Sequence, residues 1–243
     1  MNTTKKFNDG QASSDLNLYG GILDILLVIA ITIGLGILGT RIGLTTMLGG
    51  GIVNLGYVAG VLAAGYLLKL RGSGWREIGL AKPKSWSRTV LLAIAAMIGA
   101  IFMTLFSTEL ALNLMGEGAL PPDISRFNVL VGNFPMLLLL LTLAWTTIAF
   151  GEEMIYRAFL ISRLGEVFNN SKFGWNLAAL INGVIFGLVH FAEGPVGMIS
   201  NGAFGLLFGF IYLWTGRKNL WITIIAHGLL NTIRFVMVYT GSV

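Results

Sequence analysis

The stretch Phe150-Gly151-Glu152-Glu153-Met154-Ile155-Tyr156-Arg157 places two adjacent carboxylates and a guanidinium inside an otherwise apolar run. An ionisable side chain in a membrane segment costs roughly 3 to more than 10 kcal/mol, so it usually marks a functional site with a partner. The composition indicates a membrane protein, because 55% of the 243 residues are hydrophobic, 11% are charged and the mean hydropathy is +0.80. We therefore expect the partners of these charges on other membrane helices.

The apolar runs predict an all-α fold: a polytopic bundle of about seven to eight transmembrane helices, with an active-site cavity within the bilayer. Several runs approach the roughly 20 residues that a helix needs to cross the hydrocarbon layer, and they lack the alternation of a membrane barrel. The count becomes eight if part of 109–133 enters the bilayer. The expected helices are 20–39, 46–70, 88–108, 134–165, 174–191, 196–215 and 219–239.

The distribution of charge predicts the membrane topology. The linker 71–88 and the loops near 163–172 and 217–218 are basic, which places them on the cytoplasmic side. The segment 109–133 and the turn 191–196 are more acidic and then lie outside, so the N-terminus is expected in the cytoplasm. We expect a polar tail over 1–19, a single transmembrane domain over 20–243 and a motif-bearing core at about 134–243.

Composition and patterning also exclude several classes of function. The net charge of +5 does not indicate nucleic acid binding, because the basic residues form no stripe. The chain has no cysteine, which excludes disulfides, cysteine-ligated zinc and thiol nucleophiles. The glycine pattern at 34–39 resembles a dinucleotide fingerprint, but it lies inside a helix-length apolar run, so close helix packing is the better interpretation. We expect a multi-pass protein of a bacterial cell membrane whose first apolar run is retained; its oligomeric state is left open.

Both histidines of the chain, His190 and His227, fall in predicted membrane helices. Asn182, Phe186 and His190 follow one another at four-residue spacing, as do His227 and Asn231, so each set shares a helix face. Such polar groups must face protein or water rather than lipid. The two faces therefore predict a shared interior surface.

A depth estimate tests whether these polar residues can meet. At a rise of about 1.5 Å per residue from the expected cytoplasmic helix ends, Glu152 lies about 20 Å deep, His190 about 24 Å, His227 about 12 Å and Asn231 about 18 Å. All four fall in one band of the bilayer. The estimate shows that contact is compatible with the spans but does not establish it.

These polar residues also have purely structural interpretations. Glu153 and Arg157 could form only an ion pair within one helix, since they are four residues apart. A single membrane histidine or asparagine often makes only a packing hydrogen bond, and Arg234 could simply extend toward the outer interface. The convergence of several polar groups at one depth favours a functional site.

Three motifs on successive predicted membrane helices carry a family resemblance. They are EExxxR at 152–157, FxxxH at 186–190 and HxxxN at 227–231. In this order they resemble the CAAX protease and bacteriocin-processing family, also called the Abi family. The segment 75–80 is similar to one that often precedes that core, whereas Tyr156 stands where the family often has Phe and Ala158 where it often has Gly.

The resemblance implies an intramembrane glutamate endopeptidase, related to enzymes that remove the last three residues of prenylated CAAX proteins. It implies that Glu152 activates a water, that His190 assists or orients this water, and that His227 with Asn231 stabilises the oxyanion. The residue types fit this chemistry: a carboxylate in apolar surroundings suits a general base, and each oxyanion donor contributes about 3 to 4 kcal/mol. Glu153 and Arg157 are expected to pair in support, leaving Glu152 free for water.

Three alternatives stay open at this point. No cofactor is expected, but Glu152, His190 and His227 could hold zinc, although the usual HExxH spacing is absent. The chain could instead be a non-catalytic membrane binding protein, such as a bacteriocin immunity factor. An ion-coupled transporter would require repeated halves, which are not evident. The expected partners are the lipid bilayer and a peptide or membrane-protein substrate, whose identity the sequence does not indicate.

Overall fold

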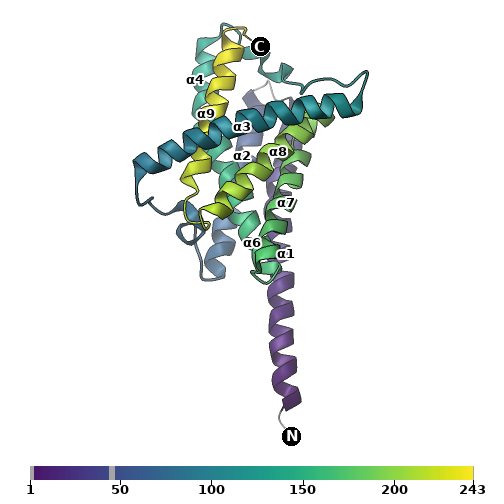
Figure 1. The fold of residues 1–243 in the computed structure, drawn as a ribbon, viewed down its shortest axis with the longest axis vertical. Helices are drawn as coiled ribbons and strands as arrows, with labels where there is room; N and C mark the ends of the chain where they lie inside the picture. The colour runs from purple at the N-terminus through teal and green to yellow at the C-terminus, as the bar shows by residue number, and fades with distance from the viewer. Residues whose placement is uncertain (1–2, 44–46, 243) are drawn as a thin grey trace.

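The computed structural model describes residues 3–43 and 47–242 and confirms an all-helical bundle (Figure 1). Within these ranges there is no β-strand, and six helices are long and apolar enough to cross a membrane. The chain is thus a multi-pass membrane protein. The helices are α1 (Thr3–Ile42), α2 (Met47–Leu70), α3 (Trp86–Met115), α4 (Phe134–Leu143), α5 (Ala149–Glu152), α6 (Ile161–Val167), α7 (Lys172–Leu188), α8 (Gly194–Trp214) and α9 (Trp221–Tyr239).

The helices α4, α5 and α6 form one continuous helix over 134–167, as expected from the sequence. Two π-helical segments, Ala144–Ile148 and Glu153–Leu160, join them, and the backbone keeps right-handed helical angles at each junction. The helix starts where the Asn133 side chain accepts a hydrogen bond from the Met136 amide, which satisfies one of the free donors of the first turn. Every residue from 151 to 165 is buried. This helix therefore forms the centre of the bundle.

Three boundaries differ from the expectation. α7 ends at Leu188 rather than at residue 191, so His190 lies in the turn after the helix and not within it. α1 begins at Thr3 instead of residue 20, because a helix satisfies its own backbone hydrogen bonds and can continue beyond its apolar part. The segment 109–133 contains no further spanning helix. α3 extends to Met115 and ends at Gly116, whose φ is +74°, and the only helix in the rest of this segment is the short 3₁₀ turn Ser125–Leu130.

The first two helices pack closely, but not through the glycines that the sequence pattern picked out. A Cβ on Gly34 or Gly36 would meet nothing within 4 Å, whereas one on Gly56 of α2 would lie 3.0 Å from the Thr32 carbonyl oxygen. The packing role predicted for Gly34 and Gly36 was therefore wrong, and Gly56 and Gly60 of α2 are the glycines that permit the close approach to Thr32. At the other end of α2, Arg71 forms an ion pair with the buried Asp24 of α1.

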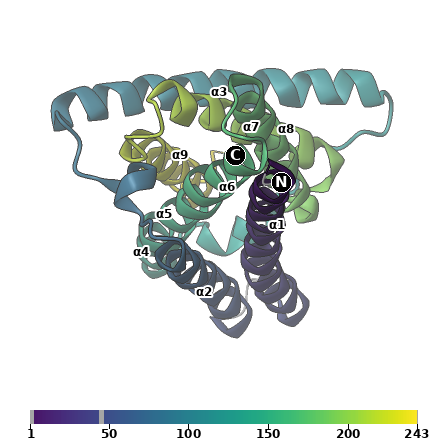
Figure 2. The ribbon, with the colours of Figure 1, turned by 90° about the horizontal axis from the view of Figure 1, so that it is seen from below.

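The remaining helices surround the central one. Figures 1 and 2 show α3 lying across the bundle, where it packs against α8 and α9. The buried face of α3 consists of small residues, which permits this close crossing. Figure 2 shows α5 and α6 inside the bundle, with α2 and α9 beside them and in contact with the central helix. This arrangement brings α2 and α9, which are far apart in sequence, against the central helix.

Candidate active site

The two carboxylates lie side by side in the central helix, at the start of a π-helical segment. Glu152 ends α5 and Glu153 begins the π segment, and both side chains are buried. The wider turns of a π-helix occur frequently at functional sites. Both residues lie near His227, but each has a further partner of its own.

Glu153 is held by two cationic or donor groups. The His227 Nδ1 lies 2.9 Å from its Oε1, and the Arg157 Nε lies 3.3 Å from its Oε2. The structure thus contains the ion pair expected between Glu153 and Arg157. Because Nδ1 of His227 faces this carboxylate, we assign a ring proton to Nδ1. The other ring nitrogen, Nε2, then points away from Glu153.

Glu152 has a different environment. The Tyr57 hydroxyl donates to its Oε1 over 2.6 Å, and its Oε2 lies 3.8 Å from the His227 Nε2. This second distance is too long for a direct hydrogen bond. With the described residues, Oε2 makes no hydrogen bond. Glu153 Oε2 makes none either, but the Arg157 Nε lies 3.3 Å from it, so Glu152 Oε2 is the one of these two oxygens without a guanidinium beside it.

Arg157 is fully buried and lies against aromatic rings. Its guanidinium carbon is 4.1 Å from the centre of the Phe186 ring and 5.4 and 5.6 Å from those of Phe204 and Phe208. Its side-chain nitrogens make no hydrogen bond to the described residues. The charge is therefore compensated by Glu153 and by cation–π contacts, which become stronger when the cation is desolvated.

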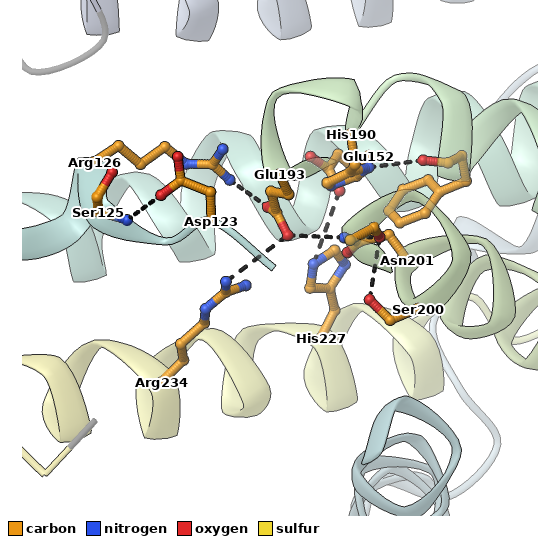
Figure 3. Close-up of polar contacts among 12 residues, drawn as sticks. Asp123, Ser125, Arg126, Glu152, His190, Glu193, Ser200, Asn201, His227 and Arg234 are labelled. Carbon is orange, nitrogen blue, oxygen red and sulfur yellow. Dashed lines mark hydrogen bonds and ion pairs between the residues drawn. The ribbon is translucent and has the colours of Figure 1, made fainter. Parts of the chain in front are cut away.

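His190 and Asn231 lie apart from this ion-pair group. The His190 Nδ1 is 2.7 Å from the Phe186 carbonyl oxygen, which assigns its proton to Nδ1 and leaves Nε2 free of that bond. The side chain of Asn231 is half-buried and makes no hydrogen bond to a described residue. Figure 3 shows His190, Glu152 and His227 in one view. No hydrogen bond or ion pair of the described chain links His190 or Asn231 to Glu152.

A second polar group was not predicted from the sequence. The buried Glu193 accepts hydrogen bonds from Arg126 and, over 2.9 Å, from Asn201, and its Oε2 lies 3.8 Å from the Arg234 Nη2 (Figure 3). We call these four residues the Glu193 cluster. Arg234 therefore pairs with a buried carboxylate, and the interpretation that it only extends toward the interface was wrong. Its position seven residues after His227 was the available signal.

The sequence did not identify Tyr57 as a site residue either. It lies in α2, outside every motif, and its hydroxyl contacts the carboxylate that the sequence singled out. A tyrosine in an apolar membrane helix needs a partner for its hydroxyl, and that need was the only hint. One helical turn earlier, Asn54 of α2 accepts a hydrogen bond from Thr147 of the central helix.

The geometry was also compared with the zinc alternative. In the described part of the chain, no three His, Asp or Glu side chains are arranged to hold a metal ion. Both histidines use Nδ1 for a protein contact and leave Nε2 open, as metal-ligating histidines do, but no contact among the described residues links His190 to Glu152. Arg157 adds a positive charge beside Glu153. The zinc alternative is tested by the chelator experiment described below.

Two grooves between helices of the described chain have apolar linings. Apolar residues line the groove between α3 and α8 and the one between α7 and α8, and neither groove contains a predicted site residue. A cavity beside Glu152 thus stays a prediction.

Comparison with known proteins confirms the resemblance that the three motifs indicate. Residues 134–233 match the family described as "Type II CAAX prenyl endopeptidase Rce1-like", and this range contains all six predicted site residues. The chain is also 26% identical over 149 residues to "Putative membrane peptidase YdiL" of Bacillus subtilis (strain 168). This match covers 61% of the present chain and 56% of that relative. No solved structure matches the chain. Tyr57 lies outside the residues that match the family.

Proposed function

We propose that this protein, whose motif-bearing half matches a membrane protease family, is an intramembrane endopeptidase that hydrolyses a peptide bond with a water activated by Glu152. One observation carries the proposal. Glu152 is buried among helices, with Oε1 held by Tyr57 and Oε2 directed at the His227 Nε2 over 3.8 Å. A water at a usual hydrogen-bond distance of about 2.8 Å could contact both atoms.

The surroundings of the pair favour Glu152 over Glu153 as the general base. Glu153 is occupied on both oxygens, by His227 and by Arg157. The Glu153 carboxylate therefore already has a guanidinium and a ring N–H as partners, which hold it in place. Glu152 has no guanidinium partner. We therefore assign proton transfer to Glu152 and orientation of His227 to Glu153.

The reaction then follows from these positions. Glu152 takes a proton from the water as the water oxygen attacks the carbonyl carbon of the peptide bond, and the carbonyl oxygen becomes an oxyanion. Collapse of this intermediate breaks the carbon–nitrogen bond, and Glu152 returns the proton to the leaving amine. Doubly protonated His227 would donate from Nε2 to the oxyanion, together with Asn231, which lies one turn further along α9. His190, with Nε2 free of its bond to Phe186, would orient the water.

A charge count supports the doubly protonated form of His227 during this step. Glu152 and Glu153 bring two negative charges, and Arg157 brings one positive charge. One further proton on His227 makes the buried group neutral, which lowers the cost of keeping it in an apolar environment.

The substrate class proposed is a peptide segment that enters the bilayer, either a peptide or the tail of a membrane protein. The test is mass spectrometry of membrane peptides from cells that express the wild type or the Glu152→Ala variant at equal levels. Glu117→Ala, which changes an exposed loop carboxylate, is the matched control. We expect a cleavage product that is present with the wild type and the control and absent with Glu152→Ala.

Other outcomes would reject parts of the proposal. Identical peptide pools in all three strains would favour the non-catalytic binding or immunity role. Loss of the product on treatment with a chelator, with recovery on addition of zinc alone, would reject the metal-free mechanism.

A further inference from the structure

We infer that Tyr57 of α2 is a positioning residue for the proposed hydrolysis, because it holds the Glu152 carboxylate so that Oε2 faces His227. The inference rests on the proposed function. It adds a residue from outside the range that matches the protease family, residues 134–233. The N-terminal half of the chain would then contribute directly to the site.

Three contacts fix α2 against the central helix at this point. The Tyr57 hydroxyl donates to Glu152 Oε1 over 2.6 Å. A Cβ on Gly151 would lie 3.2 Å from the Tyr57 Cβ, so the glycine permits the tyrosine to approach. One turn before Tyr57, Thr147 donates to Asn54. The position of the phenol along the central helix is therefore determined by contacts on more than one turn.

The hydrogen bond has a consequence for the orientation of the base. The terminal torsion of a glutamate side chain is broad, so an unconstrained carboxylate would present either oxygen in a range of directions. The phenol ring is rigid, and its bond to a charged acceptor is of the short, strong kind. Since Oε1 is engaged by Tyr57, Oε2 remains directed at the His227 Nε2 over 3.8 Å.

Kinetics of the purified protein test the role of Tyr57. The substrate is the peptide whose cleavage depends on Glu152, and the variant is Tyr57→Phe, which removes only the hydroxyl. Tyr66→Phe is the matched control, because Tyr66 lies in the same helix with its side chain 64% exposed. We expect kcat to fall by about ten-fold or more with Tyr57→Phe, because misplacement of a catalytic group acts on the chemical step, and KM to stay within about two-fold. The control should match the wild type. An unchanged kcat, or an equal loss with Tyr66→Phe, would overturn the inference.

A second measurement separates this inference from the proposed function. Thermal unfolding of wild type, Tyr57→Phe, Glu152→Ala and the double variant forms a cycle that reports the contact without any substrate. We expect Tyr57→Phe to lower the unfolding temperature in the wild type and to have a smaller effect beside Glu152→Ala. Additive effects would show that the hydrogen bond is not formed and would overturn the inference. Suppose that the cycle shows coupling, but that the mass spectrometry finds no peptide product that depends on Glu152. The proposed function then fails, and the positioning role fails with it.

Discussion

Glu152 and Glu153 are adjacent in sequence and both lie near His227, yet their other partners differ. Tyr57 holds one oxygen of Glu152, whereas His227 and Arg157 occupy both oxygens of Glu153. The difference arises because successive residues of a helix point about 100° apart. A substitution of Glu152 should therefore affect mainly activity, and a substitution of Glu153 should affect mainly stability.

Glu153→Gln should destabilise the protein strongly. It leaves Arg157 buried without a charged partner, and removing one member of a buried pair costs about 3 to 5 kcal/mol. Glu152→Gln should remove the proposed activity at a smaller cost in stability, since no guanidinium depends on Glu152. Thermal unfolding in detergent checks both, with the exposed Glu117→Gln as control. Equal destabilisation by the two substitutions would contradict the division of roles.

At the scale of helices, packing between elements decides which side chains can meet. A Cβ on Gly183 of α7 would lie 3.0 Å from the Leu206 Cβ of α8, so α7 and α8 approach closely through glycine. On α7, the centre of the Phe186 ring lies 4.1 Å from the guanidinium carbon of Arg157. Phe186 also lies 4.7 Å from the His190 ring. The FxxxH motif thus packs against the EExxxR motif through its aromatic residue.

The Glu193 cluster joins four elements and supports a prediction at this scale. Glu193 binds Arg126 of the loop before α4, Asn201 of α8 and Arg234 of α9. Glu193→Gln should loosen the loop segment 124–131 and lower the free energy of unfolding by about 1 to 3 kcal/mol. This loss is smaller than for a fully buried ion pair, because both arginines are partly exposed. Hydrogen exchange of 124–131 checks this, and exchange should be faster in the variant.

The matched control for this experiment is Glu117→Gln, which changes an exposed carboxylate in the same loop. Exchange of 124–131 at the wild-type rate in Glu193→Gln would show that the cluster does not hold the loop. The loop also contains a local hydrogen bond, from the Ser125 amide to the Asp123 carboxylate. Hydrogen bonds from the Ser125 side chain and backbone lower the pKa of this exposed aspartate.

At the scale of the whole molecule, the site joins parts of the chain that are distant in sequence. Tyr57 and Glu152 are 95 residues apart, and Glu153 and His227 are 74 apart. The central helix is buried from 151 to 165, with α2 and α9 in contact with it (Figure 2). A buried carboxylate pair is thus surrounded by helices from both halves.

The predicted membrane topology can be measured on intact cells. Because the chain has no cysteine, single substitutions report one site each. Lys84→Cys lies in the basic loop before α3, and Glu117→Cys lies in the loop after it; both positions are exposed. With the N-terminus in the cytoplasm, a membrane-impermeant maleimide should label Glu117→Cys on intact cells and Lys84→Cys only after permeabilisation. The reverse pattern would invert the predicted orientation.

The sequence by itself determined the helical class, the extent of the central helix and the identity of the carboxylate, arginine and histidine residues. These follow from local properties: hydrophobic runs of membrane length, charges inside them, and the four-residue spacing of polar groups. It also predicted the pair of Glu153 with Arg157, since both lie on one turn of one helix. The catalytic roles of Glu152, His190, His227 and Asn231 stay predictions.

Only the tertiary structure decided which helices supply the partners. Spacing identifies the face on which His227 lies, but the rotation and offset of α9 against the central helix place its Nδ1 on Glu153 and its Nε2 toward Glu152. The packing of helices likewise decides the contact of Tyr57 with Glu152 and the pairing of Arg234 with Glu193. The periodicity of a helix is a property of that helix alone, whereas the contact between two side chains on different helices depends on how the helices pack against each other.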